Sequence, residues 1–441
     1  MRKPIFMTRL LSMQATLICL VAATVFMAAP ARADTDIVEV TSPEGIKAWL
    51  VEDLADPMIT VSFAFSGGAV QDARGKEGTA VLLANLLTEG AGELDAEAFQ
   101  KQLYETGAEL SFSAEEDVLS GTLRMLADET EEPLRLLSLA LASPRFDEAS
   151  LERERARMIS SLKERSKDPD ERGNRALAKA LYGDHPLARQ ATAETVQAID
   201  QADLVDLHRR MLARDNLSIG VAGAVDRESL AGVLDAVFSD LPAENGLETL
   251  KPPRLQLGKR VHETYDRPQS AITAVYRGVS QKDTDYYAAE IATNILGGGA
   301  DSRIFLELRE KRGLTYGAYA TLQTEPDWGR LYFWTTTRAQ VPDTWQLMRE
   351  VAERFAEEGP TEKELEDAKK YMVGAYLVNG FRSTAAIAGT LVQLQQENRD
   401  RGYPQRLKEL YGAITADEVK AVTRRLLAED PTVLVVGPEV D

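Results

Sequence analysis

Apolar and polar positions along this chain follow one order of elements, and that order occurs twice. In the first half it is a strand, a helix, two strands and then charged helices, at residues 59–65, 79–87, 109–113, 119–125 and from residue 131. In the second half the same order occurs at residues 271–276, 287–296, 314–322, 330–337, 343–358 and 362–377. A repeated order of elements predicts a duplicated structural unit.

Two homologous α+β domains are therefore expected, each with one mostly antiparallel sheet whose helices pack on one side. The segments 146–155 and 359–368 are alike, since each contains a helix-capping signal followed by the start of a long charged helix. Residues 241–258 are rich in Pro, Gly and charge and show little periodicity. We assign residues 34–240 to an N-terminal domain, 241–258 to a linker and 259–441 to a C-terminal domain.

The first 33 residues have the pattern of a secretory signal peptide. Three basic residues precede or open a mostly apolar stretch at residues 10–29, and residues 31–33 read Ala-Arg-Ala, a small-x-small cleavage site. We expect removal after Ala33 and a periplasmic location; an uncleaved membrane anchor is the alternative, because the apolar run approaches spanning length. The single cysteine, Cys19, lies in this segment. The mature chain would therefore contain no thiol, and a large core would have to stabilise it.

The charge of the chain limits its partners. Asp and Glu number 70 against 51 Lys and Arg, which gives a formal net charge of −19. Removal of residues 1–33 would take away four basic residues and no acidic one, and so move the net charge to −23. Such a surface repels phosphate backbones and anionic lipid. Nucleic acid and, once the signal is removed, the membrane surface are therefore not expected as partners.

Residues 78–90 read GTAVLLANLLTEG, which by itself predicts a core helix. The segment resembles G-L-A-H-F-L-E-H-M-L-F-K-G of the M16 family, which includes pitrilysin, insulinase and the mitochondrial processing peptidase. Positions i, i+3 and i+4 share one helix face, so H-x-x-E-H directs two imidazoles at one zinc ion and a carboxylate at its water. The matching residues here are Val81, Ala84 and Asn85.

The resemblance implies that the zinc site is lost. The third ligand of the family is a Glu in a V-L-E-E-I run, and the matching residues 158–162 place Ser160 and Ser161 at the two acidic positions. Residues 167–171 and 181–186 resemble the D-D-P-x-E and Y-x-x-H-P stretches that follow. No metal is expected in this chain. Its histidines are far apart in the sequence and lack a His or Cys at ligand spacing, so structural or surface roles are expected for His185, His208 and His262.

A segment of the second half matches the family more strongly. Residues 296–316 read LGGGADSRIFLELREKRGLTY, similar to L-G-G-G-x-S-S-R-L-F-x-x-L-R-E-K-R-G-L-x-Y. The resemblance assigns Arg309 and Tyr316 to a pair that lies across the chamber from zinc and hydrogen-bonds the substrate backbone and the tetrahedral intermediate. Gly313 is expected to end the helix, so that Tyr316 opens the next strand. On spacing alone, a solvated helix end and a core tyrosine remain alternatives.

The glycine run in this segment does not predict a phosphate loop. Gly297, Gly298 and Gly299 follow a helix and lack the Lys-Ser/Thr pair of such loops. A longer glycine-rich loop at this place contacts substrate in the α subunit of the mitochondrial processing peptidase, so the resemblance implies a modest substrate-facing role. Ser160 and Lys163 form an S-x-x-K without S-D-N or K-T-G, a spacing that a helix surface supplies by chance.

The resemblance implies an M16B-type, metal-free subunit of a heterodimeric zinc peptidase. The partner would be a homologous subunit that carries H-x-x-E-H and the zinc ion, and the two would close around a chamber. A peptide or unfolded segment would be the substrate, bound partly as an added strand at a sheet edge. A non-enzymatic M16-like scaffold or interaction protein is the alternative, and catalysis by other groups of this chain alone is a third hypothesis.

Overall fold

The computed structural model describes residues 36–338 and 341–438. The predicted signal peptide, with Cys19 and the cleavage site after Ala33, lies outside these residues. From Ile37 onward the described residues belong to one compact unit. Within the described part of the chain, no helix has the length and apolar character needed to cross a membrane.

The first half of the chain contains a six-stranded sheet in the order β1-β2-β8-β3-β7-β6. Its strands are β1 (Val38–Thr41), β2 (Lys47–Glu52), β3 (Met58–Ser66), β6 (Glu109–Ala114), β7 (Val118–Leu126) and β8 (Leu217–Gly223). A small hairpin is formed by β4 (Gly90–Ala91) and β5 (Leu94–Asp95). The helices are α2 (Thr79–Leu86), α3 (Ala96–Glu105), α4 (Glu131–Ala142), α5 (Glu148–Arg165), α6 (Pro169–Tyr182), α7 (Ala193–Gln197), α8 (Gln201–Met211) and α9 (Arg227–Phe238).

The second half contains a five-stranded sheet in the order β11-β12-β10-β13-β9. Its strands are β9 (Arg260–Thr264), β10 (Ser270–Arg277), β11 (Thr315–Thr324), β12 (Gly329–Thr337) and β13 (Thr432–Gly437). The helices are α10 (Tyr286–Gly297), α11 (Arg303–Phe305), α12 (Val341–Glu358), α13 (Glu362–Gly380), α14 (Thr384–Gln396), α15 (Tyr403–Gly412) and α16 (Ala416–Leu426). A π-helical turn over Leu306–Glu310 follows α11.

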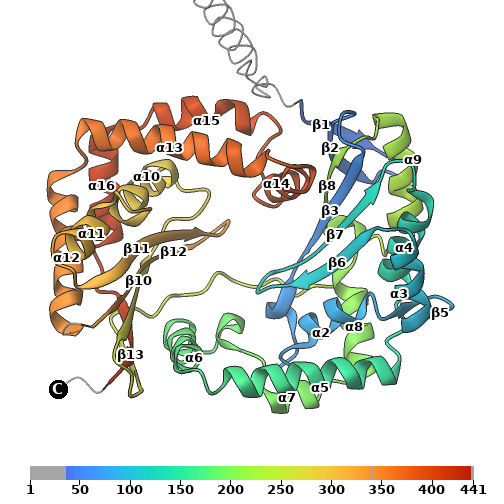
Figure 1. The fold of residues 1–441 in the computed structure, drawn as a ribbon, viewed down its shortest axis with the longest axis horizontal. Coiled ribbons are helices and arrows are strands. Elements are labelled where there is room, and N and C mark those ends of the chain that lie inside the picture. The colour runs from blue at the N-terminus through green and yellow to red at the C-terminus, as the bar shows by residue number, and fades with distance from the viewer. Residues whose placement is uncertain (1–35, 339–340, 439–441) are drawn as a thin grey trace, which may run out of the picture. The chain divides into compact units, whose positions relative to one another are not determined.

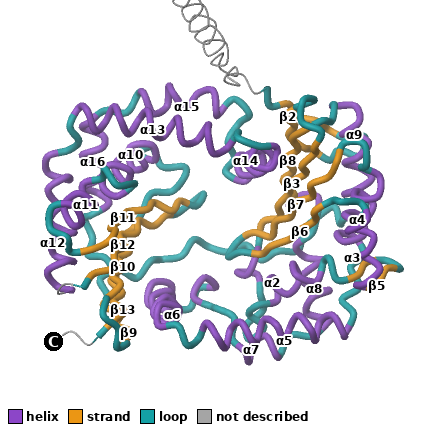
Figure 2. Tube along the Cα trace, viewed as in Figure 1, coloured by secondary structure: helices purple, strands orange, loops and turns teal. Residues whose placement is uncertain are grey.

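The strand orders confirm the repeat that the sequence predicts. The run β6-β7-β3-β8-β2 in the first sheet corresponds to β11-β12-β10-β13-β9 in the second (Figure 1). The parallel pair also falls at the same place, between β2 and β8 and between β9 and β13, whereas the other neighbours are antiparallel. The chain is thus an α+β protein with two similar halves. Residues 241–258 contain neither helix nor strand and connect them (Figure 2), while the domain boundaries themselves stay a prediction.

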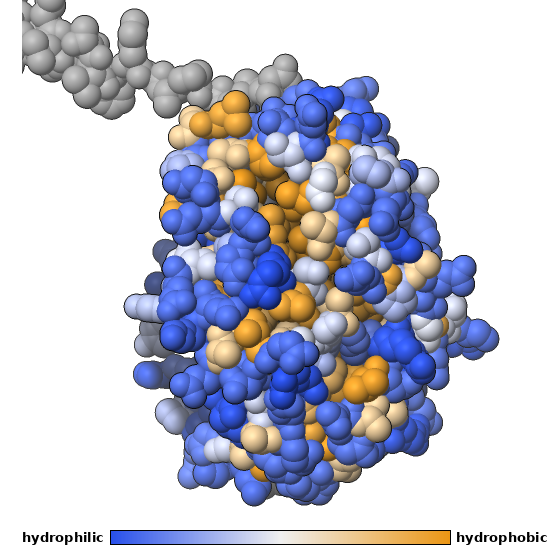
Figure 3. Space-filling model, turned by 90° about the vertical axis from the view of Figure 1, so that its right-hand side faces the viewer, coloured by the Kyte–Doolittle hydropathy of each residue, from blue (hydrophilic) through white to orange (hydrophobic). Residues whose placement is uncertain are grey.

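The outer helices of the first half are amphipathic. Helices α4 and α9 contact each other and cover one face of the first sheet (Figure 1). Figure 3 shows the face that carries α9, α4 and α3, where apolar side chains form a central band with hydrophilic side chains on either side. The apolar sides of the two helices join the core beneath, through Leu137, Leu141, Leu230 and Leu234. This arrangement matches the one-sided helix packing expected for an α+β fold.

The opposite face of each sheet is covered by a helix from the other half, an exchange that the sequence did not predict. Helix α14 packs across β8, β3 and β2 of the first sheet (Figure 1). A Cβ atom on Gly220 of β8 would lie 2.2 Å from the carbonyl oxygen of Ala388 in α14. Helix α6 packs in turn on β13 and β9 of the second sheet, where Leu177 and Leu181 join a cluster with Val275 and Leu434.

This exchange explains why the central strand β3 is buried on both faces. The apolar residues of β3 face the helices of their own half, and the alternating polar positions face α14. Thr60 has no exposed surface, and its hydroxyl group donates a hydrogen bond to Thr384 Oγ1 of α14 at 3.2 Å. Strand β3 therefore alternates in sequence as a half-exposed strand would, although α14 removes its second face from solvent.

Candidate functional site

Helix α2 begins at a buried carboxylate. Gly78 precedes the helix with a left-handed backbone (φ 109°), and Asp72 accepts hydrogen bonds from the N–H groups of Gly78 at 2.7 Å and Ala80 at 2.9 Å. The first N–H groups of a helix have no partner within the helix and need such an acceptor. Burial raises the pKa of Asp72 to about 6, although these two N–H groups act in the opposite direction. The carboxyl group thus fixes the start of α2 at an electrostatic cost.

The positions on α2 and α5 that match the zinc ligands do not present a metal-binding set. Val81 is half-buried, Ala84 is 2% exposed and Asn85 is exposed. Ser160 and Ser161 are exposed on α5, which packs against α2. Within residues 36–338 and 341–438, no group of three His, Cys, Asp or Glu side chains is placed to hold a metal ion. These residues do not fit zinc, which binds imidazole, thiolate and carboxylate groups.

A cavity of about 350 Å³ lies beside Val81. Its lining carries charge of both signs, from Asp72, Glu77, Glu115, Glu116, Glu171, Arg165, Arg175 and Arg189. Arg175 donates to the carbonyl oxygen of Ala191 at 3.0 Å, and Arg189 donates to that of Asp72 at 3.2 Å. These guanidinium groups hold the surrounding loops in place. The cavity is therefore a polar space with mixed charge next to a residue that matches a zinc ligand of the family.

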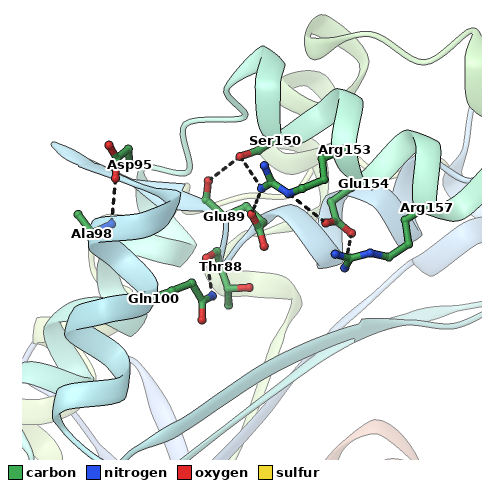
Figure 4. Close-up of polar contacts among 9 residues, drawn as sticks. All are labelled: Thr88, Glu89, Asp95, Ala98, Gln100, Ser150, Arg153, Glu154 and Arg157. Carbon is green, nitrogen blue, oxygen red and sulfur yellow. Dashed lines mark hydrogen bonds and ion pairs between the residues drawn. The ribbon is translucent and has the colours of Figure 1, made fainter.

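Charged side chains join the end of α2 to α5 (Figure 4). Arg153 on α5 forms an ion pair with Glu89, and Arg157 donates to Glu154 Oε2 at 3.1 Å. The side chain of Glu154 is 3% exposed, and its Oε1 atom lies 3.9 Å from Arg153 Nε. Glu154 precedes Ser161 by seven residues, which is about two helical turns. The ion pair between Arg153 and Glu89 thus joins α5 to the segment after α2, near one end of the matched positions, while Glu154 is paired within α5.

The structure brings Arg309 and Tyr316 together at the end of a π-helical turn. The N–H group of Lys311 donates to the carbonyl oxygen of Leu306 at 3.0 Å, which closes the π-helical turn around Arg309. Gly313 has φ 62°, and its N–H group donates to the carbonyl oxygen of Arg309 at 2.9 Å, as expected for a residue that ends a helix. Single π-helical turns are frequent at functional sites.

The side chains of the pair differ in what they contact. One Nη atom of Arg309 donates to the main-chain oxygen of Tyr316, and its Nε atom lies 3.3 Å from Glu310. Its guanidinium group also lies over the Phe305 ring, 5.5 Å from the centroid. The Tyr316 side chain is 63% exposed, with the Arg338 guanidinium group 5.8 Å from its ring centroid. Tyr316 is therefore not the core aromatic residue that spacing alone allowed.

Strand β11, which carries Tyr316, is the first strand in the order of the second sheet. Its register with β12 shifts between Thr315 and Ala318, so the strand is irregular where Tyr316 lies. Thr315 stabilises this irregularity, because its hydroxyl group lies 2.8 Å from the carbonyl oxygen of Gly317 and accepts from the Gly317 N–H group at 3.1 Å. Bulges of this kind redirect side chains and are frequent beside active sites.

Sequence reasoning missed a row of aromatic rings that extends from Arg309. Phe305 contacts Tyr319 at 6.1 Å between ring centroids, and Tyr319 stacks on Trp334 at 4.7 Å. Trp334 is 43% exposed. The signal for this row was present in residues 330–334, where large side chains occupy both faces of one strand.

The three glycines that precede this segment have different surroundings. Gly297 is buried, and a Cβ atom there would lie 2.1 Å from the main-chain nitrogen of Ala320 in β11. Gly298 and Gly299 line a cavity of about 430 Å³ together with Glu364 and other residues of α13. Close packing of α10 on β11 therefore accounts for Gly297 without a substrate. A substrate-facing role stays a prediction for the other two.

Each histidine lies beside a main-chain oxygen in a different part of the fold. The distances from Nε2 are 2.9 Å to Lys251 for His185, 2.7 Å to Leu141 for His208 and 3.4 Å to Gly437 for His262. Burial lowers the pKa of His208, which also packs edge-on against the Phe146 ring. These contacts explain the histidines by local packing and hydrogen bonding.

Comparison with known proteins places both halves in one family. Residues 48–195 match the profile described as insulinase (peptidase family M16), and residues 198–372 match that of the peptidase M16 inactive domain. Together these ranges span most of the chain.

Similar proteins include both peptidases and non-peptidases by name. The non-peptidase homolog YmxG of Helicobacter pylori is 26% identical over 72% of this chain and 75% of its own length. An uncharacterized zinc protease of Mycobacterium leprae is 25% identical over 82% of each chain. The crystal structure of a peptidase M16 inactive domain from Pseudomonas fluorescens has a TM-score of 0.84 and 28% identity, and the match covers 92% of this chain and 98% of that one.

Proposed function

Because the chain belongs to the M16 peptidase family, we propose that it is the metal-free subunit of a heterodimeric zinc peptidase in the periplasm. A homologous partner with H-x-x-E-H carries the zinc ion, and this chain supplies Arg309 and Tyr316 to the partner's active site. The substrate is a peptide or an unfolded segment. It binds partly as an added strand at the edge of a sheet, and β6 and β11 are each one of the two terminal strands of their sheets among the described residues.

One observation supports the proposal: this chain differs from the family at the positions that match the zinc site and agrees with it at the positions that match the substrate-binding pair. The matched metal positions are alkyl, amide and hydroxyl side chains, whereas Arg309 and Tyr316 remain adjacent and partly or largely exposed. A scaffold would have no need of an exposed guanidinium and phenol in this arrangement. Retention of the pair favours a role in binding substrate.

The chemistry of this chain is binding and charge stabilisation. The partner's zinc would supply the activated water. The Arg309 guanidinium and the Tyr316 hydroxyl group donate hydrogen bonds to the substrate backbone and to the negative charge that develops on the tetrahedral intermediate. Preorganised donors at a developing oxyanion contribute roughly 3 kcal/mol each. The contact of Arg309 with the Tyr316 main chain and the Phe305 ring holds its guanidinium group in place before substrate arrives.

Substitution of the pair in the assembled heterodimer tests the proposal. We expect Arg309→Ala to lower kcat/KM for peptide hydrolysis about a hundredfold, and Tyr316→Phe to lower it as well. Arg312→Ala is the matched control, because Arg312 lies in the same segment and is paired with Glu307 at 3.1 Å. Full turnover by the Arg309→Ala complex would refute the proposal, provided that thermal melting shows an intact fold.

A non-enzymatic scaffold is the second candidate, and the name of one relative, a non-peptidase homolog, favours it. A scaffold predicts a stable complex whose activity is indifferent to Arg309→Ala. Affinity capture of the mature protein from its own periplasm, with zinc analysis, addresses both candidates. We expect a partner with H-x-x-E-H, about one zinc ion per pair and an N-terminus at Asp34. Recovery of a lone zinc-free monomer would argue against the heterodimer, and chelator-resistant hydrolysis by the purified chain would indicate independent catalysis.

A further inference from the structure

The second sheet has a recess on the face that does not contact its own helices. The floor of the recess is formed by two rows of side chains that lie next to one another across β12, β10 and β13, as the register of these strands dictates. The first row runs through Trp334, Thr273 and Leu434, and the second through Thr336, Ala271 and Val436. The neighbouring positions in these strands, such as Phe333 and Ile272, belong to the helix-covered core instead. Because side chains alternate between the faces of a strand, both rows point to the same side of the sheet.

Helix α6 and the segment before β10 form the walls of the recess. Gly173 lets α6 approach β13, since a Cβ atom there would lie 2.6 Å from Val436 Cγ2. Asp170 and Asn174 of α6 and residues 267–270 complete a cavity of about 400 Å³. Arg267 donates two hydrogen bonds of 2.8 Å to the carboxylate of Asp170, so these two charges neutralise each other. Among the residues that the structure describes, no other residue that lines the cavity is ionisable. An uncharged group therefore matches the recess better than an ion.

Trp334 is the exposed aromatic group of the cavity, and it is connected to the proposed site. Its indole is 43% exposed although its floor neighbours are largely covered. Tyr319 stacks on one side of it at 4.7 Å, and Gly317 leaves room for the Tyr319 ring, because a Cβ atom on Gly317 would lie 2.6 Å from that ring. Tyr319 contacts Phe305, over which the Arg309 guanidinium group lies. Packed rings thus lead from Arg309 to the cavity.

We propose that this cavity is a specificity pocket that binds an aromatic side chain of the substrate peptide. This inference rests on the proposed function, since it assumes that a peptide lies along β11 near Arg309 and Tyr316. An aromatic ring would stack on the exposed indole of Trp334 and rest on the methyl groups of Thr273 and Thr336. Aromatic pairs gain stability beyond what the area that they bury provides. The preferred substrates then carry Phe, Tyr or Trp at one fixed distance from the scissile bond.

Direct peptide binding to this chain, without a partner, tests the pocket. The probes are fluorescently labelled peptides of one sequence that differ at a single position, which is Phe, Ala or Lys. We expect the Phe peptide to bind about tenfold more tightly than the Ala and Lys peptides. Trp334→Ala should remove this preference and leave the affinity for the Ala peptide unchanged. Tyr104→Ala is the control, because Tyr104 is an aromatic residue that is 86% exposed on α3, away from the cavity.

A second variant keeps the test valid if Trp334→Ala does not fold. Asn174→Trp places a large side chain in the cavity from the exposed side of α6 and leaves the stack of Trp334 on Tyr319 in place. It should also abolish the preference for Phe. Equal affinity for the three peptides, tighter binding of the Lys peptide, a preference that survives Asn174→Trp, or no binding of the Phe peptide would each overturn the pocket.

The test also separates failure of the pocket from failure of the proposed function. If the peptides bind without preference while Arg309→Ala still lowers turnover of the heterodimer, the pocket is wrong and the subunit role stands. If Phe is preferred and Arg309→Ala leaves turnover unchanged, the cavity binds peptides in a protein whose role is not that of a catalytic subunit.

Discussion

Removal of the buried carboxylate at the start of α2 should destabilise the protein in a pH-dependent manner. Asp72 is 4% exposed and accepts hydrogen bonds from Gly78 and Ala80. Asp72→Ala leaves these two N–H groups without their acceptor, and each such loss costs roughly 1–3 kcal/mol. The same substitution also removes a carboxylate that burial makes costly to ionise, since its pKa rises from 3.8 to about 6. The two effects oppose each other when the group is ionised.

The sign of the pH dependence follows from the position of the pKa. Because the pKa of Asp72 is higher in the folded protein than in the unfolded chain, its stabilising contribution is fully present below about pH 3.8 and is lost as pH rises through about 6. A tenfold difference in proton affinity corresponds to about 1.4 kcal/mol. Between about pH 7.5 and pH 5 the wild-type protein therefore gains roughly 1.4 kcal/mol from this group. Asp72→Ala lacks this gain.

Urea denaturation of the wild type and of Asp72→Ala at both pH values measures the effect. The cost of the substitution in free energy of unfolding should be larger at the lower pH by roughly 1.4 kcal/mol. Asp226→Ala is the control, because Asp226 caps α9 at the surface and the Ser229 N–H group, which donates to it at 2.8 Å, holds its pKa below 3.8. Its cost should be equal at the two pH values. A cost for Asp72→Ala that is independent of pH, or larger at the higher pH, would refute the account.

Two further predictions concern the second half. Gly297→Ala should lower the melting temperature markedly, because its Cβ atom would lie 2.1 Å from a main-chain nitrogen. Gly299→Ala is the control and should melt like the wild type, since the nearest neighbour of its Cβ atom lies at 3.3 Å. Equal melting temperatures of the two variants would show that α10 can move. Glu325→Gln should raise the melting temperature at about pH 8 and not at about pH 5. Burial and the adjacent Asp117 carboxylate raise the pKa of Glu325 to about 7. The contribution of Glu325 to the stability of the fold is therefore lost as pH rises through that value. A gain of the same size at both pH values would contradict this.

The parts of the fold that the sequence predicted are those with local signals. Helix α2 has a continuous apolar core run, and Gly313 ends the π-helical turn because it adopts a left-handed backbone. Tyr316 lies at the start of β11, as expected from the position of Gly313, whereas the family resemblance, and not the spacing, assigned it to a pair with Arg309. The residue types at the positions that match the zinc ligands could also be read from the sequence, since a ligand set is a matter of residue type.

The parts that the sequence did not predict depend on contacts between distant segments. The stack of Tyr319 on Trp334 requires the register of β11 with β12, and the cavity beside it requires α6 from the other half. The burial of Thr60 likewise depends on α14, more than 300 residues away. Hydrophobic periodicity reports which side of one element is apolar, and it carries no information on which partner covers the other side.

The exchange of α6 and α14 has a consequence for how this fold arose. Each of these helices follows the long charged helix of its own half and covers the sheet of the other. A single ancestral half would have had an uncovered sheet face and a helix with nothing of its own to pack on. Two identical copies that exchanged this helix would have covered both sheet faces and packed both helices, as in a domain-swapped dimer. Fusion of the two genes would then have kept this exchange within one polypeptide.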